Sequence, residues 1–160
     1  MNELIRTASI FVLILAAAPL TMGSGDADAT VWKHDQFSAM EKKLAQELDE
    51  ESAASDVLGT YGNHHVEIAL RKATGNAELH ETQNDVFFVV SGKATLITGG
   101  TLVDPKMTEP HEFEGKTIQG GTRTKLAGGD VVHIPFKVPH QLIVEKGNEI
   151  EYFVVKIDAK

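Results

Sequence analysis

The sequence predicts an all-β domain, a sandwich or barrel of short antiparallel strands that follows a single α-helix. Three observations support this fold class. Apolar and polar residues alternate along much of the chain after residue 57, Gly and Pro separate short apolar runs, and only one stretch has helical spacing. Many short strands with tight turns are typical of closed or double-sheet β folds, which avoid exposed sheet edges.

The first 29 residues have the pattern of a secretory signal peptide. A short segment with Arg6 precedes an apolar run from Ala8 to Leu20, and small residues lead to Ala27-Asp28-Ala29. The run is shorter than the roughly 20 apolar residues of a membrane-spanning helix. We expect cleavage after Ala29, with an earlier cut before Ser24 or an uncleaved anchor as alternatives. Cleavage predicts a periplasmic or secreted protein without stable membrane insertion.

The composition narrows the classes of partner. The formal net charge is −8, and the sequence has no dense run of Lys and Arg, so nucleic acid and anionic membranes are not expected partners. The chain has no Cys. Its stability therefore comes from the core without disulfides, although small exported domains often use them.

Residues 30–56 are expected to form an N-terminal helical segment. Phe37, Met40, Leu44 and Leu48 recur at three- and four-residue spacing with charged residues between them. This is the pattern of an amphipathic helix that packs one stripe against a larger body. A single barrel domain over residues 57–160 is expected to follow, since the length suits one domain.

The barrel domain begins with an alternating stretch. His64, Val66, Ile68 and Leu70 share one face of the expected strand, and His65, Glu67, Ala69 and Arg71 share the other. Further short strands are expected at 78–80, 86–90, 94–98, 131–135, 141–144 and 150–157. Residues 99–124 are rich in Gly, Thr, Pro and charge, and are expected to form surface loops.

Two stretches carry the candidate site. Between Gly75 and Gly92, Glu78 and His80 lie two residues apart and therefore share a strand face, and Asp85 follows a short turn. Between Gly129 and His140, a second histidine comes directly after Pro139, which restricts the backbone before it. The two stretches are expected to form the halves of one metal or ligand pocket.

These stretches resemble the paired motifs of the cupin superfamily, G(x)5HxH(x)3-4E(x)6G and G(x)5PxG(x)2H(x)3N. The spacing from His80 through Asp85 to Gly92 fits the first motif, and the spacing from Gly129 through Pro135 to His140 fits the second. The resemblance implies a double-stranded antiparallel β-helix, the cupin or jelly-roll barrel, over roughly residues 61–156.

The sequence departs from both motifs at several positions. Glu78 stands where the first motif has a His, and Asp85 where it has a Glu. Gly is replaced by Lys72 and Lys137, and Asn by Val144. By position, the resemblance implies a metal site formed by Glu78, His80, Asp85 and His140, with Glu78 either a ligand or a catalytic acid or base.

A site of His and carboxylate ligands suits a divalent Fe, Mn, Ni, Co or Zn ion. The first hypothesis is therefore a metal-dependent enzyme acting on a small molecule, such as an oxygenase, isomerase or lyase. The alternative is a non-catalytic cupin module that binds a sugar or other small molecule without metal. A third hypothesis is a structural subunit that acts by dimerisation, and a homodimer is expected because cupin-like domains favour one.

Overall fold

The computed structural model describes residues 29–159, which contain one helix and twelve strands. The helix is α1 (His34–Leu44). The strands are β1 (Ala53–Tyr61), β2 (His64–Arg71), β3 (Ala77–His80), β4 (Gln83–Thr98), β5 (Thr101–Val103), β6 (Lys106–Glu109), β7 (Glu112–Gly115), β8 (Thr117–Gln119), β9 (Thr122–Ala127), β10 (Val131–Ile134), β11 (His140–Ile143) and β12 (Ile150–Asp158). This content confirms the predicted all-β class with one N-terminal helix.

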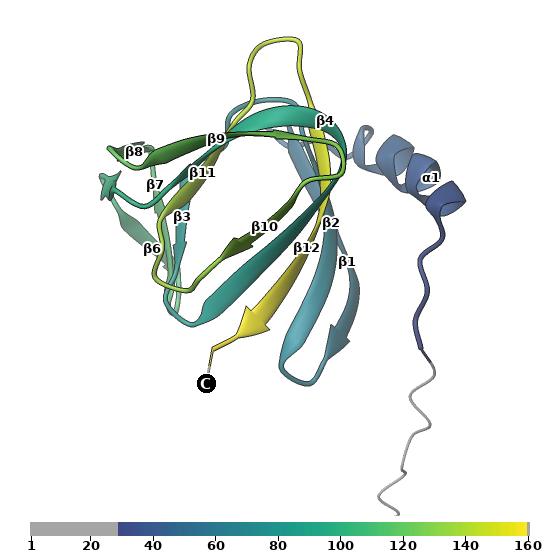
Figure 1. Ribbon diagram of the computed structural model, residues 1–160, viewed down its shortest axis with the longest axis horizontal. Helices are drawn as coiled ribbons and strands as arrows, with labels where there is room; N and C mark the ends of the chain where they lie inside the picture. Colours follow the sequence, from purple (N-terminus) through teal and green to yellow (C-terminus); the bar gives the residue numbers. More distant parts are fainter. Residues whose placement is uncertain (1–28, 160) are drawn as a thin grey trace, which may run out of the picture. The chain divides into compact units, whose positions relative to one another are not determined.

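Ten of the strands form one antiparallel sheet that curls into a barrel, while β5 and β8 form a separate pair (Figure 1). The 16-residue strand β4 joins the two halves of the sheet. Its first half pairs with β10 and β12, and its second half pairs with β9 and β11. Gly92 lies at the change of partners with φ +78, where a Cβ would lie 2.0 Å from the carbonyl oxygen of Glu149. Only Gly allows this close approach.

The largest buried apolar cluster contains residues from both halves of the sheet. Phe87 and Val89 of β4, Leu142 of β11 and Tyr152 of β12 belong to it. Because side chains alternate along a strand, these positions share the inward face with the polar residues of the site. The core therefore forms the wall and floor of the cavity described below.

Helix α1 packs against the outer face of the sheet at β1 and β2 (Figure 1). Leu44 is fully buried with Ile68 and Leu70, while Met40 and Leu48 pack at the edge of this cluster. The predicted apolar stripe is thus the buried side of the helix. Phe37 also contacts Phe153 of β12, with ring centroids 4.9 Å apart.

Two segments differ from the expected boundaries. Strand β1 begins at Ala53, inside the range assigned to the helical segment, because the chain leaves the helix at Leu44 and pairs with β2 from Ala53 onward. Residues 99–124 were expected as loops but contain β5 to β8 and the start of β9. Short antiparallel pairings between polar Thr- and Glu-rich segments escape detection because they lack an apolar alternation.

The signal peptide expected over residues 1–29 lies almost entirely outside the described residues. Within residues 29–159, no helix is both long and apolar enough to cross a membrane.

Candidate functional site

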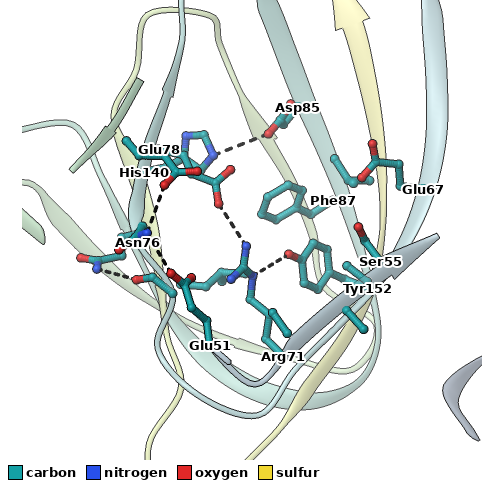
Figure 2. Close-up of a pocket in the computed structure, with 18 of the residues that line it drawn as sticks. Glu51, Ser55, Glu67, Arg71, Asn76, Glu78, Asp85, Phe87, His140 and Tyr152 are labelled. Atoms are coloured by element: carbon teal, nitrogen blue, oxygen red, sulfur yellow. Dashed lines mark hydrogen bonds and ion pairs between the residues drawn. The ribbon is translucent and has the colours of Figure 1, made fainter. Parts of the chain in front are cut away.

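A cavity of about 260 Å³ lies inside the barrel, between β2, β3, β4, β11 and β12. Figure 2 shows its polar and aromatic side chains pointing toward one another from these strands. Phe87 and Tyr152 form an aromatic wall with ring centroids 4.9 Å apart. The cavity is therefore partly apolar, with charged groups around it.

Strand register brings the four predicted site residues together. In the antiparallel ladder, β11 places His140 opposite Glu78 of β3, and the alternation along β3 points His80 in the same direction. Asp85 enters from the start of β4 and is only 1% exposed. The structure thus brings together all four side chains, although their role as metal ligands stays a prediction.

The donor atoms of these residues converge closely. The candidate ligand atoms of Glu78, His80 and His140 all lie within 4.8 Å of one another. A carboxylate oxygen of Asp85, Oδ2, lies 3.3 Å from Nε2 of His80 and 3.5 Å from Nε2 of His140. Glu78, His80 and His140 are therefore close enough together to hold a metal ion, and Asp85 lies beside both histidines.

Both histidines are hydrogen-bonded through Nδ1, the ring nitrogen that faces away from the site. The Nδ1 atom of His80 is hydrogen-bonded to the Glu112 carboxylate, which β7 places opposite His80 in the sheet register. The Nδ1 atom of His140 lies 3.2 Å from the carbonyl oxygen of Val138, to which it donates. A proton on each Nδ1 leaves each Nε2 lone pair directed into the site, the orientation found in metal-binding histidines.

The charges of the site follow from burial and close partners. Burial lowers the pKa of His140, so that its ring is neutral at neutral pH. Burial opposes ionisation of Glu78 and Asp85, but the neighbouring basic groups, which include Lys156 for both, outweigh burial and lower both carboxyl pKa values. The site therefore combines a neutral imidazole with two carboxylates, the protonation state in which such groups bind metal ions.

Lys156 of β12 is a further member of the site that the sequence pattern did not identify. Its Nζ atom lies 3.0 Å from Nε2 of His80 and 3.4 Å from both carboxylate oxygens of Asp85. Burial opposes the charge of Lys156, yet the carboxylates of Asp85 and Glu78 raise its pKa. The residue therefore carries a positive charge against the converging donors.

This contact also defines the proton position on His80. Burial lowers the pKa of His80, whereas the carboxylates of Asp85 and Glu112 raise it overall. With Nδ1 already protonated toward Glu112, a second proton on Nε2 would make the ring an imidazolium and place two positive groups 3.0 Å apart. The tautomer with the proton on Nδ1 avoids this repulsion, because Nε2 then accepts a hydrogen bond from Lys156.

Arg71 and Tyr152 form a second polar group inside the cavity (Figure 2). Arg71 contacts an oxygen of Glu78 at 3.1 Å through Nη2 and donates from Nε to the Tyr152 hydroxyl at 3.3 Å. Burial raises the pKa of Tyr152, so the hydroxyl stays protonated. Because the hydroxyl accepts from Arg71, its own proton can be donated to a bound molecule.

The site contains four residues that lie outside both motifs and were missed for that reason: Arg71, Glu112, Tyr152 and Lys156. The alternation of β2 does place Arg71 on one face with Glu67 and Ala69, all three of which line the cavity. Lys156 was also detectable as a lone charge on the face of Tyr152 and Val154 in an apolar strand. No sequence pattern indicated Glu112 as a site residue, because its segment lacks the apolar alternation that predicts a strand.

No protein-family model matches the chain, and no curated protein matches it. Solved structures do match. TT1209 from Thermus thermophilus has a TM-score of 0.51 at 17% identity, covering 75% of this chain and 95% of that one. Rru_A2000 from Rhodospirillum rubrum, a cupin-2 domain, has a TM-score of 0.50 at 13% identity, covering 67% and 60%. Streptomyces PAC13, solved with uridine, has a TM-score of 0.50 at 10% identity, covering 70% and 74%.

These similarities establish the fold. The chain is a cupin-fold protein, with the jelly-roll barrel that the two motifs implied. At 10–17% identity the likeness extends to the fold and no further. Function must therefore be argued from the side chains of the site.

Proposed function

We propose that this protein binds a divalent metal ion and acts as a metal-dependent enzyme on a small polar molecule. The observation that carries the proposal is the orientation of two histidines, His80 and His140. Each is hydrogen-bonded at Nδ1 from outside, so that both Nε2 atoms face Glu78 and Asp85 across a buried point. Acceptors facing one another in a buried site need a cation beside them. Lys156 contacts His80 and Asp85 in this role, whereas a divalent ion would contact all four residues.

Glu78, His80, Asp85 and His140 would hold the ion, which would supply Lewis-acid chemistry to a bound substrate. Glu78 also contacts Arg71, and its carboxylate lies 3.7 Å from Nε2 of His80. If it stays unligated, Glu78 can take a proton from the substrate. Oxygenase, isomerase and lyase chemistry are all compatible with this arrangement.

The rest of the cavity favours a small polar substrate. Its volume of about 260 Å³ is at the lower end of ligand pockets. Arg71 and the Tyr152 hydroxyl would orient a polar group, while Phe87 and Tyr152 exclude water from one side. That PAC13 was solved with uridine supports small-molecule binding in this fold, without indicating the substrate of this chain.

Metal analysis tests the proposal. Protein purified without added chelator should contain close to one divalent ion per chain, and a His140→Ala variant should lose it. Elemental analysis by mass spectrometry measures both values and identifies the metal. A native protein without metal, which also fails to take up Mn, Fe, Co, Ni or Zn, would refute the proposal.

A metal-free binding module is the second candidate, and the Lys156 contact favours it. The ammonium group already neutralises Asp85 and satisfies His80, as a protein without a metal would require. In that case the cavity would bind a sugar or other small molecule through Arg71 and Tyr152. Bound metal distinguishes the candidates, and bound metal without turnover of any substrate would favour a binding role.

Export and dimerisation also stay proposals. The N-terminal pattern supports a periplasmic or secreted protein, and the amino-terminal sequence of protein from the exported fraction would test cleavage after Ala29. Homodimer formation is tested by light scattering coupled to size-exclusion chromatography. Phe88 and Val131, paired and exposed on the outer face, form an apolar surface available to a second copy.

A further inference from the structure

Lys156 lies at the centre of the site, although neither cupin motif includes it. The register of the sheet places it beside Asp85 of β4 on one side and His65 of β2 on the other. Its side chain is 17% exposed, so the ammonium is held largely away from water. A buried ammonium is stable only where anions and acceptors surround it, and here Asp85, Glu78 and His80 provide them.

The ammonium and a divalent ion require the same donors. Nζ lies within 3.4 Å of His80 Nε2 and both Asp85 oxygens, and those are atoms that a metal would need. With Lys156 and Arg71 positive and Glu78 and Asp85 negative, these four groups sum to zero. Adding a divalent ion beside Lys156 would bring two cations close together in a low-dielectric site, where their repulsion is strong.

An alternative position for the ammonium lies next to the site. A second cavity of about 520 Å³ is also lined by Lys156, on the side of β6 and β7. Its wall carries three carboxylates, Glu109, Glu112 and Glu114. A lysine side chain that rotated out of the site could therefore keep an anionic partner, since its long stem allows the charged group to move between the two cavities.

We infer that Lys156 is an internal cation that competes with the divalent ion and moves into the outer cavity when the ion binds. This inference rests on the proposed metal site. The residue then sets the affinity of the site, because each metal that binds must first displace the ammonium. A consequence is that the protein exists in two forms, one closed by Lys156 and one loaded with metal.

Titration calorimetry of chelator-treated protein with Mn²⁺ and Co²⁺, at one fixed pH, tests the inference. A Lys156→Met variant, which keeps the length of the side chain without its charge, should bind at least tenfold more tightly than the native protein. Lys125→Met, an exposed change on β9, is the matched control and should leave the affinity unchanged. Circular dichroism confirms that each variant is folded.

Chemical labelling gives a readout that does not depend on affinity. Acetylation of lysines, followed by mass spectrometry, should find Lys156 protected in the metal-free protein and reactive after Mn²⁺ is added. Lys125, exposed on β9, should react equally in both states.

The results of these two experiments can contradict the inference about Lys156 without contradicting the proposed metal site. Metal binding by the native protein, with unchanged affinity in Lys156→Met or unchanged labelling of Lys156, would overturn the inference and leave the metal site standing. Absence of binding in both proteins would overturn the metal site and the inference with it. Binding by Lys156→Met alone would refute the proposed function of the native protein and overturn the movement of Lys156 on metal binding.

Discussion

The guanidinium of Arg71 occupies the space beside the backbone of Gly75. An ideal Cβ on Gly75 would lie 2.2 Å from Nη1 of Arg71, which is far inside van der Waals contact. Gly75 is buried and its φ is not positive, so the backbone itself would accept Ala. The missing side chain at position 75 therefore allows Arg71 to reach Glu78 and Tyr152.

Gly75→Ala should destabilise the fold by about 1–3 kcal/mol, because Arg71 must leave its place or the backbone must shift. Chemical denaturation measures this cost. The control is a double-mutant cycle with Arg71→Ala, in which the space for the new Cβ already exists. A cost that is the same in both backgrounds would contradict the explanation.

Glu112 should govern metal affinity through His80 without touching the ion. Glu112→Ala removes the acceptor at Nδ1 of His80 and should weaken metal binding about 10- to 100-fold, the usual effect of losing such a partner. Glu112→Gln keeps an acceptor oxygen and should recover part of the affinity. Glu145→Gln, an exposed change after β11, is the matched control; equal losses in both Gln variants would indicate only a change in overall charge.

Glu151 should make the stability of the protein decrease as pH rises. It is 2% exposed, shares the outer face with Phe153, and has one oxygen without a hydrogen-bond partner among the described residues. Burial raises its pKa, with Glu41 of α1 and Glu149 adding to the effect and Ser91 opposing it. Because the folded state then holds the proton more tightly than the unfolded state, the protonated carboxyl contributes to stability. This contribution is fully present below the unfolded pKa and is lost as pH rises through the folded pKa.

Glu151→Gln removes this titration and should be more stable than the native protein by about 1 kcal/mol at pH 8. The difference should shrink at pH 4, where the native carboxyl is protonated in both states. Denaturation curves at the two pH values measure it, and Glu145→Gln, an exposed change in the turn before β12, is the control. An advantage of the same size at both pH values would rule out the carboxyl as its cause.

Lys137 should be replaceable by Gly with a gain in stability. Its φ is +63, the left-handed region that a lysine enters at a cost, and it stands where the second motif has Gly. Lys137→Gly should raise the free energy of unfolding by up to about 1 kcal/mol. Lys146→Gly, at a position without positive φ, should instead lower it; two changes of the same sign would contradict the argument.

The fold and the four converging residues were predictable because both depend on local patterns. Period-two alternation and Gly turns indicate strands, and the motif spacing relates His80 to Asp85 and Gly92. The segment between Gly99 and Thr124 was not predictable in detail, since its polar strands carry no alternation. These strands mattered, because β7 supplies Glu112.

The contact between Lys156 and Asp85 could not be predicted from either residue alone. The two are 71 positions apart, and only the register of β12 against β4 brings them together. A one-residue change in that register would turn Lys156 to the opposite face. The composition of the site therefore depends on a long-range pairing that no local pattern specifies.

Strand β12 can pair in only one register without misplacing a charge. In the native register it directs Tyr152 and Lys156 inward and Phe153 toward α1. A slip by one residue would leave Asp85 buried without a cation and turn Phe153 into the polar site. Loss of the contact between Lys156 and Asp85 therefore adds an energetic cost to a barrel in which β12 pairs one residue out of register.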